Sequence, residues 1–130
     1  MSSSQIRPLS GDADGSGILI TAANTGDAQV VHKAGDENTA TEKITVWATW
    51  NTGTRPTLHF EWGVDTATRH IAVELADPSA TGVDSTRVGW TLAIPGILLK
   101  SGLEIQCYAT VASGSLGNVN LHGHAEIITG

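Results

Sequence analysis

The sequence predicts a single all-β domain that folds as an antiparallel β-sandwich, and three observations support this fold class. Apolar and polar residues alternate with a period of two in most segments, which places alternate side chains on one face of a strand. Clusters of Gly, Ser, Thr, Asn and Asp separate these segments, as turns require, and glycine alone supplies 15 of the 130 residues. No segment shows sustained helical periodicity, so we expect no significant helix.

The alternation predicts about eight short strands, spaced as in a sandwich or a closed barrel. They cover residues 17–22, 28–33, 42–50, 57–64, 70–75, 88–94, 103–111 and 119–127. Each has one apolar face, as antiparallel strands covered on one side require. In the sixth strand, Val88, Trp90, Leu92 and Ile94 are expected to face the core, with Pro95-Gly96 ending the strand.

The length of the chain fits one domain with one core. We expect residues 17–130 to form this domain and residues 1–16, rich in Ser, Gly and Asp, to form an N-terminal arm. Cys107 is the single cysteine, so the fold does not depend on an internal disulfide, and assembly in a reducing cytoplasm is the simplest interpretation.

Charge and hydropathy argue against two classes of partner. The formal net charge is −6 with seven Lys and Arg residues, whereas nucleic-acid binding normally needs clustered cations. No stretch approaches the roughly 20 apolar residues of a membrane span, and the Met1 to Ser4 segment lacks the features of a secretory signal. We therefore expect neither nucleic acid nor a membrane as a partner.

Four tryptophans stand out because the chain has six aromatic residues of the Phe, Trp and Tyr type. Trp50, Trp62 and Trp90 fall in phase with core faces. Trp47 falls out of phase and is a candidate for stacking on a sugar ring or for a protein interface. Alternatively, a β-bulge returns Trp47 to the core, or the N-terminal arm covers it.

Histidines supply the other candidate binding residues. His122, His124 and Glu126 are spaced two apart on one expected strand, so their side chains point to the same side. Such a row of side chains can bind zinc if His59 or His70 lies on the neighbouring strand. Otherwise it is a stripe that faces solvent or an interface. At a subunit contact it would make association sensitive to acid. We predict no metal and no cofactor.

The sequence contains no recognisable catalytic centre. No serine lies in a Gly-x-Ser-x-Gly elbow, and Glu61 and Glu74, which could form an acid/base pair, are better explained as solvated carboxylates. The Asp12 to Gly17 segment resembles the start of a calcium loop, but Ala23 stands where the bidentate carboxylate belongs. An acidic turn is the preferred interpretation, and the protein is predicted not to be an enzyme.

A family resemblance supplies the functional expectation. The segments Ile44-Thr45-Val46-Trp47-Ala48-Thr49-Trp50, Thr57 to Asp65, Ala93-Ile94-Pro95-Gly96 and Leu121-His122-Gly123 together resemble small β-sandwich virion proteins of tailed bacteriophages. The resemblance covers residues 44–130 and lies in the overall sequence pattern. It implies an eight-stranded jelly roll, preferred over an immunoglobulin-like topology, and a capsid decoration, spike or other accessory role.

We therefore expect a non-enzymatic structural protein of the virion, assembled in the host cytoplasm, that forms a homotrimer and attaches to other virion proteins such as the major capsid protein. The alternative is a carbohydrate-binding, lectin-like module that recognises surface glycans. The candidate interface or glycan residues are Trp47, His59, His70, His122, His124 and Glu126.

Overall fold

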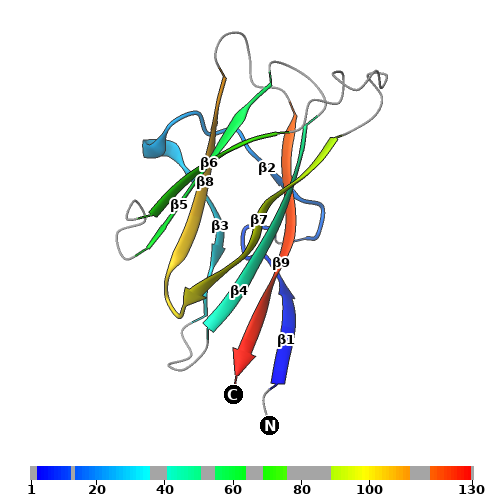
Figure 1. Ribbon diagram of the computed structural model, residues 1–130, viewed down its shortest axis with the longest axis vertical. Coiled ribbons are helices and arrows are strands. Elements are labelled where there is room, and N and C mark those ends of the chain that lie inside the picture. Colours follow the sequence, from blue (N-terminus) through cyan, green and yellow to red (C-terminus); the bar gives the residue numbers. More distant parts are fainter. Residues whose placement is uncertain are drawn as a thin grey trace.

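Two antiparallel β-sheets pack against each other, which confirms the predicted β-sandwich (Figure 1). The architecture is seen in a computed structural model that describes residues 3–12, 14–35, 41–50, 55–63, 69–75, 89–111 and 118–129. The described residues form nine strands and one short 3-10 helix, η1 (Thr25–Asp27). No helix among them has the length and apolar character needed to cross a membrane.

The strands divide between a sheet A and a sheet B. Sheet A has the order β1-β9-β4-β7, and β2 also pairs with β9; its strands are β1 (Ser3–Pro8), β2 (Ile18–Leu19), β4 (Thr41–Trp50), β7 (Gly89–Lys100) and β9 (Val119–Thr129). Sheet B has the order β3-β8-β5-β6, with β3 (Gln29–Lys33), β5 (Thr57–Gly63), β6 (Arg69–Glu74) and β8 (Glu104–Thr110).

The chain crosses repeatedly between the two sheets. After β2 in sheet A it forms β3 in B, β4 in A, β5 and β6 in B, β7 in A, β8 in B and β9 in A. This order is the winding of a jelly roll if β1 and β2, which both pair with β9, are treated as two parts of one edge strand. The expected count of eight is not confirmed, because the described residues contain nine strands.

The inward faces of both sheets form one apolar core. Ile44 and Val46 on β4 and Leu58 and Phe60 on β5 are fully buried, and Cys107 on β8 lies in the same cluster. Their spacing of two is the alternation visible in the sequence. Fully burying one such aliphatic or aromatic side chain contributes about 1.5–3 kcal/mol.

Strand β7 differs from the prediction. It continues through Pro95 and Gly96 to Lys100, and its pairing with β4 shifts on both sides of Val46. These irregularities change the phase of the strand, so that Leu92, expected in the core, is 42% exposed and Ala93 is buried instead. Val88 of the predicted core face lies outside the described residues.

The N-terminal segment forms part of sheet A. Residues 1–16 were expected as an arm; in the structure Ser3–Pro8 pairs along β9, from Ser3 opposite Thr129 to Pro8 opposite His124. The start of β1 and the end of β9 therefore lie side by side (Figure 1). Leu9, which follows β1, is buried in the core.

Candidate functional site

The outer surface of sheet A, called face A here, carries four of the six candidate binding residues. On β4, Lys43 and Trp47 point outward because they alternate with the buried Ile44, Val46 and Ala48. Side chains directly opposite one another on neighbouring strands point to the same face. The pairing of β4 with β7 and β9, and of β9 with β1, therefore assigns the remaining residues of face A.

One row of face A contains Trp47. Leu92 lies opposite it on β7 and His122 lies opposite it on β9. Trp47 is 39% exposed, so the outward interpretation of the sequence is confirmed and neither a bulge nor the N-terminal segment buries it. A Cβ added to Gly17 would lie 2.6 Å from His122 Cε1, which shows that the loop before β2 packs on this imidazole.

A second row pairs two opposite charges between two apolar side chains. Lys43 lies opposite Glu126 on β9 and opposite Leu98 on β7, and Ile6 on β1 lies opposite Glu126. Leu98 is 63% and Ile6 67% exposed. From β7 to β1 the row therefore reads apolar, basic, acidic, apolar. His124 lies between the two rows, opposite Thr45 and half-buried.

Within the described part of the chain, the exposed apolar side chains are concentrated on face A. Seven large hydrophobic side chains in the described residues are exposed, and six of them occupy outward positions of sheet A: Ile6, Leu19, Trp47, Leu92, Leu98 and Ile128. The seventh, Val30, lies opposite Gln106 on the outer surface of sheet B. Such a concentration on one side marks an interaction surface.

The outer surface of sheet B, called face B here, carries the other two candidate residues. His59 on β5 lies opposite Tyr108 on β8, and their rings stack with centroids 4.5 Å apart and an interplanar angle of 4°. His59 Nδ1 lies 3.0 Å from His70 Nε2 on β6, and His59 Nε2 lies 2.9 Å from Thr110 Oγ1. Three strands thus fix the orientation of one imidazole.

The electrostatics of face B follow from this packing. Partial burial, and next the neighbouring His70, lower the pKa of His59, while the carboxylate of Glu61 acts in the opposite direction. Partial burial, and next the charges of Glu61 and Cys107, raise the pKa of Tyr108. The lowered pKa favours the neutral form of His59, in which one ring nitrogen carries a lone pair and the other a proton.

The two histidine pairs lie on opposite sides of the sandwich. His59 and His70 belong to sheet B, whereas His122 and His124 belong to sheet A, so the condition for a joint zinc site is not met. Among the residues that the structure describes, no group of three or more His, Cys, Asp or Glu side chains is arranged to hold a metal ion. Glu61 and Glu74 are also separated. Glu74 lies opposite Thr57, and Thr57 is four residues, or about 13 Å along β5, from Glu61.

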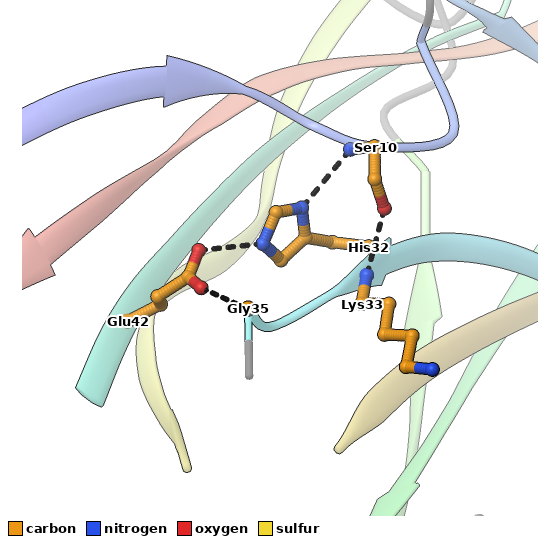
Figure 2. Close-up of polar contacts among 5 residues, drawn as sticks. All are labelled: Ser10, His32, Lys33, Gly35 and Glu42. Atoms are coloured by element: carbon orange, nitrogen blue, oxygen red, sulfur yellow. Dashed lines mark hydrogen bonds and ion pairs between the residues drawn. The ribbon is translucent and has the colours of Figure 1, made fainter. Parts of the chain in front are cut away.

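A buried polar network lies between the sheets (Figure 2). His32 Nε2 lies 2.7 Å from Glu42 Oε1, and these side chains are only 2% and 1% exposed. The Ser10 N–H donates to His32 Nδ1 over 3.0 Å, and the Gly35 N–H donates to Glu42 Oε2 over 2.6 Å. Because Nδ1 accepts, the ring proton resides on Nε2 and is donated to Glu42.

This network has the residue types of a catalytic triad but a different geometry. Its contact to His32 comes from the backbone nitrogen of Ser10, and the Ser10 hydroxyl accepts a hydrogen bond from the Lys33 N–H over 2.7 Å. A nucleophile needs its hydroxyl bonded to the imidazole. The arrangement instead ties the segment after β1 to β3 and β4, which is a structural role.

The residue pattern alone did not predict this network. Glu42 gave a usable signal, because it has the same phase as the core residues Ile44 and Val46. His32 gave none: the pairing of β3 with β8 shifts between Val30 and His32, and this bulge turns both Val31 and His32 inward. Simple alternation would have placed His32 on the outer surface.

The Asp12 to Gly17 loop has the hydrogen bonds of an acidic turn. Asp12 Oδ1 accepts from the Gly17 N–H, and Asp14 Oδ1 accepts from both the N–H and the hydroxyl of Ser16. These carboxylates are thus satisfied within their own loop.

Comparisons with protein-family models, with curated proteins and with solved structures gave no match for this chain. Function is therefore inferred from the two faces and the buried network.

Proposed function

We propose that this protein is a non-enzymatic structural protein of a bacteriophage particle, which associates with copies of itself through face A and attaches to other virion proteins such as the major capsid protein. The observation that supports this proposal best is the concentration of exposed apolar side chains on face A. The resemblance of residues 44–130 to phage virion proteins supports the virion part, with assembly in the host cytoplasm.

A second copy of the chain fits face A because the Lys43 row is self-complementary. A twofold axis parallel to the strands, between β4 and β9, would place Lys43 of each chain over Glu126 of the other. The same operation would place Leu98 over Ile6 at both ends of the row. Opposite charges surrounded by apolar contacts give an interface both register and desolvated area.

The self-association is tested by measuring the mass of the protein in solution at micromolar concentration, by light scattering or sedimentation. The wild type should have a mass above that of one chain. Leu98→Glu should lower the mass to that of a single chain, because it places a charge in the interface. Val30→Glu is the matched control, because it adds the same charge to an exposed apolar position on the other sheet. A monodisperse monomeric wild type would contradict the proposal.

The size of the assembly distinguishes two arrangements. A twofold contact through face A gives a pair of chains, whereas the sequence resemblance favours a trimer. We propose the pair as the basic contact. If the wild type has the mass of three chains and Leu98→Glu lowers it to the mass of one, face A is still the interface. A threefold axis then takes the place of the twofold axis.

The virion role needs a separate test on phage particles that carry the gene. The protein should sediment with purified particles through a density gradient, and mild denaturant should release it, because the attachment is non-covalent. Particles assembled with Leu98→Glu should carry less of it than particles assembled with Val30→Glu. Absence of the wild-type protein from purified particles would exclude the virion role.

One observation favours the lectin-like alternative. Trp47 exposes part of its indole beside His122, and a sugar ring can stack on such a surface while polar groups bind its hydroxyls. A glycan array, together with the change in tryptophan fluorescence on adding a sugar, tests this alternative. Glycan binding that Trp47→Ala removes would support it, and it is compatible with a structural role in the virion.

A further inference from the structure

We propose that His59 and His70 on face B form a two-histidine site for a divalent transition metal ion of the imidazole-binding class, namely Ni²⁺, Cu²⁺ or Zn²⁺. This site lies on the opposite sheet from face A and is independent of the proposed function. It is carried by the distance between two ring nitrogens on adjacent strands, His59 Nδ1 and His70 Nε2, which are 3.0 Å apart.

That distance matches two ligands of one metal ion. With metal–nitrogen bonds of about 2.0–2.1 Å, two imidazole nitrogens lie about 2.9 Å apart at a right angle and about 3.3 Å apart in a tetrahedron. The observed 3.0 Å is between the two and nearer the right angle of tetragonal Ni²⁺ or Cu²⁺ sites. In the metal-free protein these two nitrogens share one hydrogen bond. Metal binding replaces this bond, and its proton moves through solvent to the other ring nitrogen of the donor imidazole.

The surroundings of His59 are those of a metal ligand. Its other nitrogen, Nε2, lies 2.9 Å from Thr110 Oγ1. When this hydroxyl accepts the Nε2 proton, the lone pair of Nδ1 points toward His70. The stacked ring of Tyr108 fixes the plane of the imidazole. Both contacts exist before the metal arrives, which reduces the entropy lost on binding.

Charge and access also favour a cation. The Glu61 carboxylate acts electrostatically on His59, and the chain as a whole carries a net charge of −6. His70 is exposed on β6, the edge strand of sheet B, so that an ion reaches the pair directly from solvent. With two protein ligands, water or a second molecule completes the coordination shell.

Calorimetric titration of the untagged, full-length protein with NiCl₂ tests the site. The wild type should bind one Ni²⁺ per chain, and His70→Ala should weaken binding at least about tenfold by removing one of the two ligands. Thr110→Val should weaken it about tenfold, because it removes the hydrogen bond that positions His59. In the Cu²⁺ complex, electron paramagnetic resonance should show two nitrogen ligands in the wild type and fewer in His70→Ala.

The double variant His122→Gln/His124→Gln is the matched control, since it removes the other histidine pair from the opposite sheet. It should bind Ni²⁺ like the wild type. The proposal is overturned if the wild type shows no saturable binding, if His70→Ala binds as tightly as the wild type, or if the control variant is the one that loses binding. Circular dichroism of each variant verifies that the sandwich is intact.

Discussion

His32 Nε2 donates a hydrogen bond to Glu42 Oε1 across 2.7 Å in the interior, where both side chains are buried. The same carboxylate accepts the Gly35 N–H, and the same imidazole accepts the Ser10 N–H. A buried polar group is tolerated only when its hydrogen bonds are made, and in this network each group supports the next. Polar contacts around the buried His32–Glu42 pair therefore hold Ser10, β3 and β4 together.

Glu42→Ala should destabilise the protein strongly, because it leaves the buried His32 donor and the partly buried Gly35 N–H without an acceptor. Breaking a buried pair in this way costs about 3–5 kcal/mol of unfolding free energy. Urea denaturation measures the loss. The His32→Leu/Glu42→Leu double variant should lose less than the sum of its single variants, because the two side chains are coupled. Additive losses would contradict the coupling.

Exchange of charges on face A should change the assembly in a predictable way. In the twofold arrangement Lys43→Glu brings two acidic rows together, and Glu126→Lys brings two basic rows together. Each single variant should weaken self-association about tenfold or more, since like charges in an interface cost several kcal/mol. The double variant restores opposite charges and should recover most of the affinity.

Concentration-dependent sedimentation of the four proteins gives the association constants for this charge exchange. The measurement should be repeated at high salt, which screens the exposed charges and should reduce the difference between the single variants and the wild type. If the double variant associates as weakly as the singles, Lys43 and Glu126 do not meet across the interface. The twofold register would then be wrong, while the apolar contact could remain.

The sequence predicted most of the fold, because alternation with a period of two is a local property. It assigned the inward faces of β4, β5, β8 and β9 correctly. It failed where pairing overrides the local pattern. The register shifts on both sides of Val46 interrupt the alternation of β7 at Ala93, so that Leu92 is exposed while Ile94 faces the core as predicted. Ser3–Pro8 is a polar segment that becomes a strand by pairing with β9.

The candidate sites also divide into features that are local to one strand and features that depend on pairing between strands. The outward position of Trp47 is one of the two alternatives that the sequence left open, and it follows from a local property, the phase of β4. The contact of His59 with His70, and the position of His122 opposite Trp47, depend on which strands are neighbours and in what register they pair. Such non-local pairing is not encoded in the residue pattern of either strand, so the sequence indicated these histidines as candidates but not which of them lie together.

The acidic loop gives a prediction about pH. The hydroxyl and then the N–H of Ser16 hold the pKa of Asp14 below its ordinary value, because both bonds favour the ionised carboxylate. A carboxyl whose pKa is lower in the folded state stabilises the protein above its unfolded pKa, and this stabilisation is lost as the pH falls through the folded pKa. The loss of this stabilisation therefore occurs in the acid range, below about pH 4.

Ser16→Ala should raise the pKa of Asp14 toward its ordinary value, since it removes the shortest of these bonds. Titration of the Asp14 carboxyl by nuclear magnetic resonance measures the midpoint directly. Ser101→Ala, in the turn between β7 and β8, is the control and should leave the Asp14 midpoint unchanged. An Asp14 midpoint that is the same in Ser16→Ala and in the wild type would contradict the hydrogen-bond explanation.

Cys107 should be inert in the folded protein. Its side chain is fully buried between the sheets, and burial raises the pKa of the thiol far above its usual value, so the reactive thiolate is absent at neutral pH. A disulfide reagent added to the native protein should therefore react at the rate at which the sandwich opens. In denaturant the same thiol should react at once. Glu42→Ala should increase the native rate, because a less stable sandwich opens more often. Rapid reaction of the folded wild type would show that β8 does not seal this part of the core.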